Sequence, residues 1–343
     1  MALQLLSTLK GAALKQLAFK CGVSTSGVKA TLCQRLQDEI PLLPGPKLAK
    51  KSGAQKEPMR ILSIDMGIRN LAYCVLDVPT DSSLPNLVAW KRIAVSSAPV
   101  PSNDKSELDS KVEKESFEPP VLSAAAFKLL RKTLLPHNPT HILIERQRFR
   151  SMGSPKILEW TVRVNMLESM IYAILLTLRE EGAWNGTVVP IAPGKVGPFW
   201  LEGEATSAAL EEAEVGESSP TTVAKTKTRN AKLAKAFNKG AKIDLVRNWL
   251  AIGDKVGVDS PDVETLVKAY LDKWDKKPGG VKGKRPAKDA VATIEKMGKL
   301  DDLADSLLQG MAFIQWEENK RIAREEGISS LLEPVAKYKV IPR

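Results

Sequence analysis

The stretch Arg60–Val78, RILSIDMGIRNLAYCVLDV, decides the fold of this chain, because it predicts two strands joined by a tight turn. The run ILSI is short and apolar, as is typical of a strand covered on both faces. Gly67 frees the backbone to turn, and Leu71 opens the second apolar run. Asp65 ends the first strand, where a buried carboxylate needs a cation or a hydrogen-bond donor. An Asp that only caps its own turn is the alternative.

The composition is that of a soluble globular protein with room for one large domain and one small one. The 343 residues are 43% hydrophobic and 27% charged. A formal net charge of +11 favours a polyanionic partner, nucleic acid before membrane. The three cysteines show neither metal-finger spacing nor an even disulfide set, which indicates reduced thiols inside a cell. Charged residues interrupt the longest apolar candidate, Ile157–Leu178, so no run is expected to reach transmembrane length.

The N-terminal segment carries no acidic residue before Asp38. Its apolar spacing predicts two short amphipathic helices within Leu5–Ile40, joined by GVSTSG. The pattern LKGAALKQLAFKCGVSTSGVKATLCQRL resembles the SAP motif, a helix–loop–helix unit that binds DNA. The resemblance implies DNA contacts from Lys29 and Arg35. An organelle transit peptide has the same acid-free composition, and composition leaves both interpretations open.

The order of the predicted elements indicates the architecture. Proline, glycine and lysine in residues 41–58 predict a linker between a SAP-like unit (1–40) and a large second domain (59–343) with a charged insert at about 201–240. After the hairpin we expect strands at Leu87–Ser96, His141–Glu145 and Thr187–Pro193, helices at Val121–Leu135, Pro155–Glu181, Lys242–Leu250 and Leu300–Glu325, and loops at Ala98–Pro120 and Asp272–Lys288. This order predicts an α/β fold with a mixed five-stranded sheet flanked by helices.

Carboxylates stand at the ends of several of these elements. Glu145 ends the fourth strand, and Asp301, Asp302 and Asp305 lie in the first turns of the last helix. The spacings of three and four residues place Asp305 on one helix face with either Asp302 or Asp301. Carboxylates brought together raise one another's pKa unless a cation compensates, and hard oxygen ligands suit Mg²⁺ or Mn²⁺.

Each carboxylate alone also has an ordinary structural explanation. Asp301 and Asp302 fit helix capping, and Glu145 fits an ion pair with Arg146 or Arg148. The whole set favours a metal site, because two divalent ions can clamp the attacking and leaving oxygens of a phosphodiester.

Three stretches, IDMGIRNLAYCVLD, LIERQRFRS followed by EWTVRVNMLESMIYAIL, and KLDDLADSLLQGMAFIQW, resemble the fungal mitochondrial Holliday-junction resolvases. That family includes the yeast cruciform-cutting endonuclease and has a RuvC-like, RNase H-like fold; the similarity runs from about Arg60 to Glu318. It implies metal ligands at Asp65, Glu145 and Asp305, with Asp301 or Asp302 as a further ligand. The implied cofactor is Mg²⁺, for which Mn²⁺ substitutes, with two ions per site.

The resemblance also implies an activity and a partner. The expected reaction is paired, symmetric, metal-dependent cleavage of four-way DNA junctions, in mitochondrial DNA recombination and segregation in the matrix. A junction is close to two-fold symmetric, so a homodimer is expected. The alternatives are another RNase H-like nuclease, acting on RNA–DNA hybrids or flaps, and a non-catalytic junction-binding protein. His137 and His141, the only histidines, have no matched nucleophile motif, so serine, cysteine or zinc hydrolase chemistry is not expected.

Basic residues near these carboxylates are candidates for phosphate contact. Arg146, Arg148 and Arg150 follow Glu145 directly, with a solvated basic loop as the alternative. Phe149 lies among them. It is either a wedge that separates base pairs at a branch point or a ring that packs on the protein's own core. Further candidates are Lys195, expected to face the cleft, and Lys225, Lys227, Arg229, Lys232, Lys235, Lys282, Lys284 and Arg285.

Overall fold

The computed structural model describes residues 6–40, 58–81, 83–95, 116–147, 158–201, 239–275 and 300–332. The chain divides into two compact units. The larger unit holds the described residues within 58–193 and 239–310, and the smaller holds 6–40, 194–201 and 311–332. The predicted linker at 41–58 and the charged insert at about 201–240 lie almost entirely outside the described residues.

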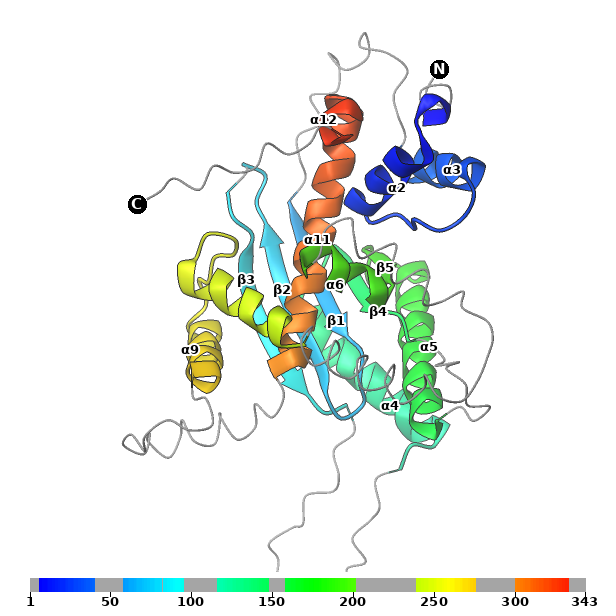
Figure 1. The fold of residues 1–343 in the computed structure, drawn as a ribbon. Coiled ribbons are helices and arrows are strands. Elements are labelled where there is room, and N and C mark those ends of the chain that lie inside the picture. Colours follow the sequence, from blue (N-terminus) through cyan, green and yellow to red (C-terminus); the bar gives the residue numbers. More distant parts are fainter. Residues whose placement is uncertain are drawn as a thin grey trace, which may run out of the picture. The chain divides into compact units, whose positions relative to one another are not determined.

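The larger unit is built on a mixed five-stranded sheet, which confirms the predicted α/β class (Figure 1). Its strand order is β3-β2-β1-β4-β5. The strands are β1 (Met59–Asp65), β2 (Leu71–Val78), β3 (Asn86–Ile93), β4 (His141–Glu145) and β5 (Thr187–Ile191). The first three form an antiparallel meander, and β4 and β5 continue the sheet parallel to β1. Because β1 and β4 are parallel neighbours, their carboxyl ends meet at one edge of the sheet.

One face of the sheet is covered by α4 (Pro119–Leu129) and α5 (Glu159–Glu180). The predicted helix at Val121–Leu135 is α4, prolonged by a π-turn at Leu130–Leu134 and a 3₁₀ turn at Leu135–His137. Alternate strand residues, among them Leu62, Ile64, Tyr73 and Ile142, share one buried core with both helices. The alternation of side chains along a strand therefore sends the remaining residues of β1, including Asp65, to the opposite face.

By length and composition alone, α5 is apolar enough to cross a membrane, contrary to the expectation that no such run exists. In the folded unit one side of α5 is buried, through Val164, Leu167, Ile171 and Leu175, in the core beneath the sheet. A helix with one buried stripe and charged residues opposite is the pattern of a core helix.

The opposite face of the sheet is covered by the first turns of α11 (Leu300–Glu325), whose bounds match the prediction. The indole nitrogen of Trp90 on β3 donates to the carbonyl of Leu303 at 3.0 Å. Beside it lies α9 (Pro261–Asp275), which the sequence prediction missed; a loop had been expected from Asp272 onward. Residues 239–252 form a further helix, longer than predicted.

The smaller unit contains the predicted N-terminal helix pair, α2 (Gly11–Lys20) and α3 (Lys29–Glu39), together with α6 (Pro193–Leu201) and α12 (Ser329–Leu332). The pair lies in one compact unit with these segments from later in the chain. Its buried leucines share a core with Ala323 and Leu331 from the C-terminal part of the chain. A helix pair this short buries little apolar surface alone, which explains why it recruits these partners.

Candidate functional site

Two carboxylates meet at the sheet edge where β1 and β4 end. The register of these strands pairs Ile64 with Ile144, so Asp65 and Glu145 are the next residues along each strand. Ile64 and Ile144 belong to the core under α4 and α5, and the strand alternation therefore places both carboxylates on the α11 face. The sequence prediction that strand-end acids converge is confirmed for this pair, whose side chains hydrogen-bond to each other.

Burial and the neighbouring carboxylates set the electrostatics of the pair. Burial, followed by the charge of Glu145, raises the pKa of Asp65 well above its usual range, and Asp305 and Asp302 raise it further. Burial also raises the pKa of Glu145. The hydrogen bond between the two side chains acts to raise the pKa of Asp65 and to lower that of Glu145, because a proton shared by two carboxyls relieves their repulsion.

Of the two candidate partners for Asp305 on α11, the structure sets Asp302 beside Asp65. The pKa of Asp65 responds to Asp302 and Asp305, whereas Asp301 acts on Tyr270 of α9. Residues 302, 305 and 309 lie on one helix face. Sequence spacing left Asp301 and Asp302 equivalent, because it does not say which face of α11 meets the sheet.

Polar and steric contacts fix that face of α11. The amide nitrogen of Gln309 donates to the hydroxyl of Ser63 at 3.1 Å and to the carbonyl of Ile64 at 3.2 Å. One residue on, a Cβ at Gly310 would lie 2.7 Å from the Cδ1 of Leu76, so an added methyl group would force the helix or the Leu76 side chain to move. Asp305 lies one turn before Gln309 and is thereby carried over the end of β1.

Each α11 carboxylate has a basic partner in this structure. Arg92 donates to Asp302 at 3.1 Å, Lys242 donates to Asp305 at 2.8 Å, and Lys239 pairs with Asp301. The sequence prediction missed these three cations, since they come from β3 and from the helix at 239–252, far from α11 in sequence. In this structure each of the three α11 carboxylates therefore faces a lysine or arginine side chain.

The donor set fits a divalent metal ion in its chemistry. Four carboxylates gather here, one of them with a strongly raised pKa, and a hard cation would relieve that repulsion. Within the described part of the chain, no three Asp, Glu, His or Cys side chains form a closed metal cage as they stand. Lys242 occupies one oxygen of Asp305 in this arrangement, so that oxygen reaches a cation only after this ion pair opens.

The predicted DNA-contact residues are only partly described. Arg146 is exposed, and its backbone nitrogen donates to the carbonyl of Ile191 at 2.8 Å, which extends the sheet edge past Glu145. Lys29 is exposed at the start of α3, and Arg35 donates to the carbonyl of Ser26 at 2.6 Å. Arg148, Phe149, Arg150, Lys225, Lys227, Arg229, Lys232, Lys235, Lys282, Lys284 and Arg285 lie outside the described residues.

The structure corrects the prediction for Lys195. Its ammonium donates to the carbonyl of Gly22 at 2.6 Å, and burial lowers its pKa. Both residues belong to the smaller unit. Lys195 therefore joins α6 to the loop after α2 rather than facing a cleft.

A cluster of arginine and aromatic side chains, unforeseen from the sequence, joins the β1–β2 turn to the starts of α4 and α5. The Arg69 guanidinium lies 5.1 Å from the ring centre of Trp160 and 5.9 Å from that of Phe117. Arg163 lies 4.2 Å from Phe117. Trp160 keeps 38% of its surface exposed. Arg69 follows Asp65 by four residues, so this arginine–aromatic cluster lies at the carboxylate edge of the sheet.

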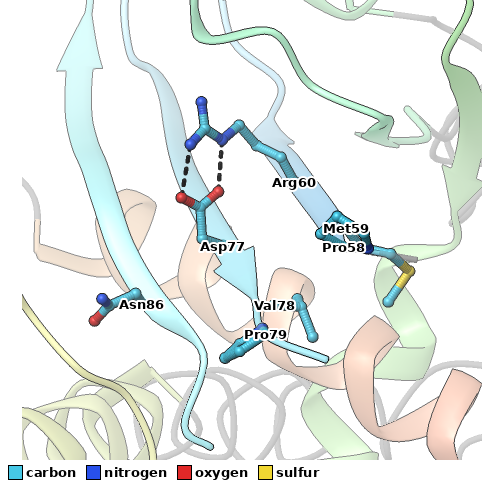
Figure 2. A pocket seen from close by; sticks show the side chains of 7 residues that line it. All are labelled: Pro58, Met59, Arg60, Asp77, Val78, Pro79 and Asn86. Atoms are coloured by element: carbon cyan, nitrogen blue, oxygen red, sulfur yellow. Dashed lines mark hydrogen bonds and ion pairs between the residues drawn. The ribbon is translucent and has the colours of Figure 1, made fainter. Parts of the chain in front are cut away.

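A cavity of about 440 Å³ lies at the other end of the sheet. Its lining residues are Pro58, Met59, Arg60, Asp77, Val78, Pro79 and Asn86. Figure 2 shows the Arg60 guanidinium facing Asp77, with bonds of 2.5 and 2.7 Å. Because its charged groups pair with each other and lie roughly 17 Å along β1 from Asp65, this cavity is separate from the carboxylate site.

Known proteins share this fold and much of this sequence. The sequence profile of the family described as "Mitochondrial resolvase Ydc2 / RNA splicing MRS1" matches residues 61–322. A mitochondrial cruciform cutting endonuclease 1 from Schizosaccharomyces pombe is 34% identical over 170 residues, 49% of this chain and 56% of that protein. Its namesake from Saccharomyces cerevisiae is 23% identical over 324 residues, 90% of this chain and 82% of that protein.

A solved structure agrees with these matches. The yeast mitochondrial Holliday junction resolvase Ydc2 superposes with a TM-score of 0.53 at 23% identity, covering 94% of this chain and 98% of that one. The fold is thus common to both proteins, and the profile match spans most of the chain. This chain belongs to the family of the mitochondrial resolvase Ydc2 and the RNA-splicing protein MRS1.

Proposed function

We propose that this protein is a metal-dependent endonuclease that resolves four-way DNA junctions in the mitochondrial matrix. The observation that carries the proposal is the group of Asp65, Glu145, Asp302 and Asp305, held at one sheet edge with a raised pKa at Asp65. A protein that only binds nucleic acid gains nothing from burying acids beside the phosphates it attracts. The two curated relatives are named mitochondrial cruciform cutting endonucleases, which supports both substrate and compartment.

The four carboxylates would hold Mg²⁺, with Mn²⁺ as a substitute and two ions per site. Bound divalent ions supply Lewis-acid stabilisation of charge on the phosphoryl oxygens. The protein's own contribution is positioning. Gln309 anchors α11 on β1, and Arg92 orients Asp302 from the side. Lys242, once it releases Asp305, leaves a cation beside the site for a DNA phosphate.

The substrate suggests the assembly. A four-way junction is nearly two-fold symmetric, and its resolution needs two matched nicks. A homodimer with one carboxylate site per subunit meets that requirement. The exposed Arg146 and the arginine–aromatic cluster border the site and supply groups for phosphate and base contact.

The test is a cleavage assay on labelled substrates. A four-way junction, a matched linear duplex, an RNA–DNA hybrid, a flap and a structured RNA are each incubated with Mg²⁺ or with EDTA. Paired symmetric nicks in the junction alone, and only with Mg²⁺, support the resolvase. Preferred cleavage of the hybrid or the flap would mean that this nuclease acts on that substrate and not on a four-way junction. Binding without cleavage would point to the second activity in the family description, RNA splicing.

Trp160→Ala is expected to weaken junction binding by about 1–3 kcal/mol, the usual contribution of an aromatic ring that stacks on an unpaired base. Trp160 is half exposed, and Arg69 holds its ring at the carboxylate edge. Affinity is measured in EDTA by fluorescence anisotropy. Leu176→Ala, on an exposed position further along α5, is the matched control. Equal affinities for the two variants would remove the cluster from the DNA surface.

Lys195→Met is expected to lower the free energy of unfolding by about 1.5–3 kcal/mol, because it breaks the charged hydrogen bond to Gly22. Junction affinity should stay unchanged. Lys29→Met, at an exposed position, should do the opposite: weaker binding with an unchanged melting temperature. Reduced affinity for Lys195→Met would restore the original interpretation of Lys195 as a DNA contact.

A further inference from the structure

The hydroxyl of Tyr270 on α9 is fully buried and has no hydrogen-bond partner among the described residues. A buried hydroxyl without a partner costs free energy, so native proteins rarely retain one without a reason. Three other buried polar atoms share this condition: Gln37 Oε1, Tyr172 Oη and Trp316 Nε1. Of the two tyrosines in this set, Tyr270 is the one near carboxylates of α11: after burial, Asp305 and Asp301 raise its pKa, whereas Glu168 does so for Tyr172.

Packing holds the Tyr270 ring next to the start of α11. The ring lies on Trp90, with centroids 4.9 Å apart at an angle of 44°. The Trp90 indole in turn donates to the carbonyl of Leu303, which lies between the acids of α11. Two aromatic rings thus tie β3, α9 and α11 together, and the phenol has little freedom to move away.

The surroundings of the hydroxyl are acidic. After burial itself, Asp305, Asp301 and Asp244 are the groups that raise the pKa of Tyr270. The phenol therefore stays protonated at any physiological pH and remains a hydrogen-bond donor among acceptors. One oxygen of Asp301 pairs with Lys239, and one oxygen of Asp305 pairs with Lys242.

We propose that Tyr270 is a positioning residue of the carboxylate site, whose hydroxyl donates to the α11 carboxylates, directly or through one water, when a divalent cation is bound. The inference rests on the proposed function in one respect, that this site binds a divalent cation. Once Lys242 releases Asp305, that side chain needs a new donor to fix its orientation. Tyr270 is the donor already in place, and its burial keeps competing solvent away. Donors of this kind behind a ligating carboxylate set its orientation and its affinity for the cation.

Tyr270→Phe tests the proposal, since it removes one oxygen and keeps the ring on Trp90. The metal-free variant should melt at the same temperature as the parent protein or slightly higher, because an unsatisfied polar atom is gone. Its dissociation constant for Mn²⁺, measured by titration calorimetry on the full chain without DNA, should rise about 10–100-fold. The Mg²⁺ concentration for half-maximal cleavage should rise in parallel.

Tyr172→Phe is the matched control, because it deletes the other buried tyrosine hydroxyl that lacks a partner. Its Mn²⁺ affinity should equal that of the parent protein. If Tyr270→Phe also binds Mn²⁺ as tightly as the parent, the positioning role is wrong while the metal-dependent nuclease stands. A parent protein that binds no Mn²⁺ would overturn the proposed function and this role together.

Discussion

Asp65→Asn is expected to lower the rate of junction cleavage by about 10³-fold, because it removes one carboxylate from the proposed metal site, where metal-ion stabilisation would be worth several kcal/mol. Asn keeps the size of Asp and one carbonyl oxygen, so the change is one of charge. Junction affinity should be equal or higher, since a negative charge facing the DNA phosphates is gone. Single-turnover cleavage in Mg²⁺ and anisotropy in EDTA measure the two quantities separately.

The matched control is Asp77→Asn, on β2 at the far end of the sheet. Asp77 pairs with Arg60 and takes no part in the carboxylate site, so its loss should reduce stability and leave the cleavage rate unchanged. An Asp65→Asn protein that cuts as fast as the Asp77→Asn protein would show that the carboxylate site is not catalytic.

Asp65→Asn is also expected to change stability, and the sign of that change follows from the pKa of Asp65. Burial and neighbouring charges raise that pKa in the folded protein, so the folded state retains a proton that the unfolded chain has lost. Free energy of unfolding therefore falls as pH rises from the unfolded pKa toward the folded one, and stays lower above it. Asn has no proton to lose. In EDTA the Asp65→Asn protein should melt at the same temperature as the parent protein below about pH 4. As pH rises further, it should melt at an increasingly higher temperature than the parent.

The elements that carry local signals were predicted well. β4 and α11 have their predicted bounds, and β1 ends at Asp65 as predicted. These signals depend on neighbours in the sequence. The order of the strands then brought Asp65 and Glu145 to one edge, because parallel strands end together.

What could not be predicted depends on contacts between distant residues. Asp301 and Asp302 differ only in which way α11 faces, and Gln309 and Gly310 decide that by touching β1 and β2. The cations that hold the α11 acids lie some sixty residues upstream or on β3. No periodicity links them to α11, so only the fold reveals them.

Two misses had a usable signal. Helix α9 begins with a proline and has acidic residues in its first turn, which is a regular helix start. Its buried Val263, Val267 and Tyr270 recur at helical spacing. The small size of the N-terminal helix pair also indicated that it needs a partner, although only the structure identifies α12 and the end of α11 as that partner.

Gly310→Ala is expected to lower the free energy of unfolding by about 1–3 kcal/mol, because the added methyl group overpacks a closed interface. A Cβ there would lie 2.7 Å from Leu76 Cδ1, 3.4 Å from Ser63 Cβ and 3.5 Å from Cys74 Sγ, and all three residues are fully buried. Ala itself favours a helix more than Gly does, so a loss of stability would have to come from this contact. Gly11→Ala, where nothing lies within 4 Å, is the control and should not destabilise.

The larger effect of Gly310→Ala is expected on cleavage. We expect the buried surroundings of Leu76 to restrict its side chain, so that α11 moves away from the sheet and carries Asp305 and Asp302 with it, whereas Asp65 and Glu145 stay on their strands. A displacement near 1 Å between catalytic groups can cost about 10²-fold in rate. Cleavage is measured well below the melting temperature, so that the variant is folded. A destabilised variant that still cuts at the parent rate would mean that α11 does not set the geometry of the site. Because Asp305 and Asp302 raise the pKa of Asp65, a slow variant in which that pKa is unchanged would mean that the acids of α11 had not moved.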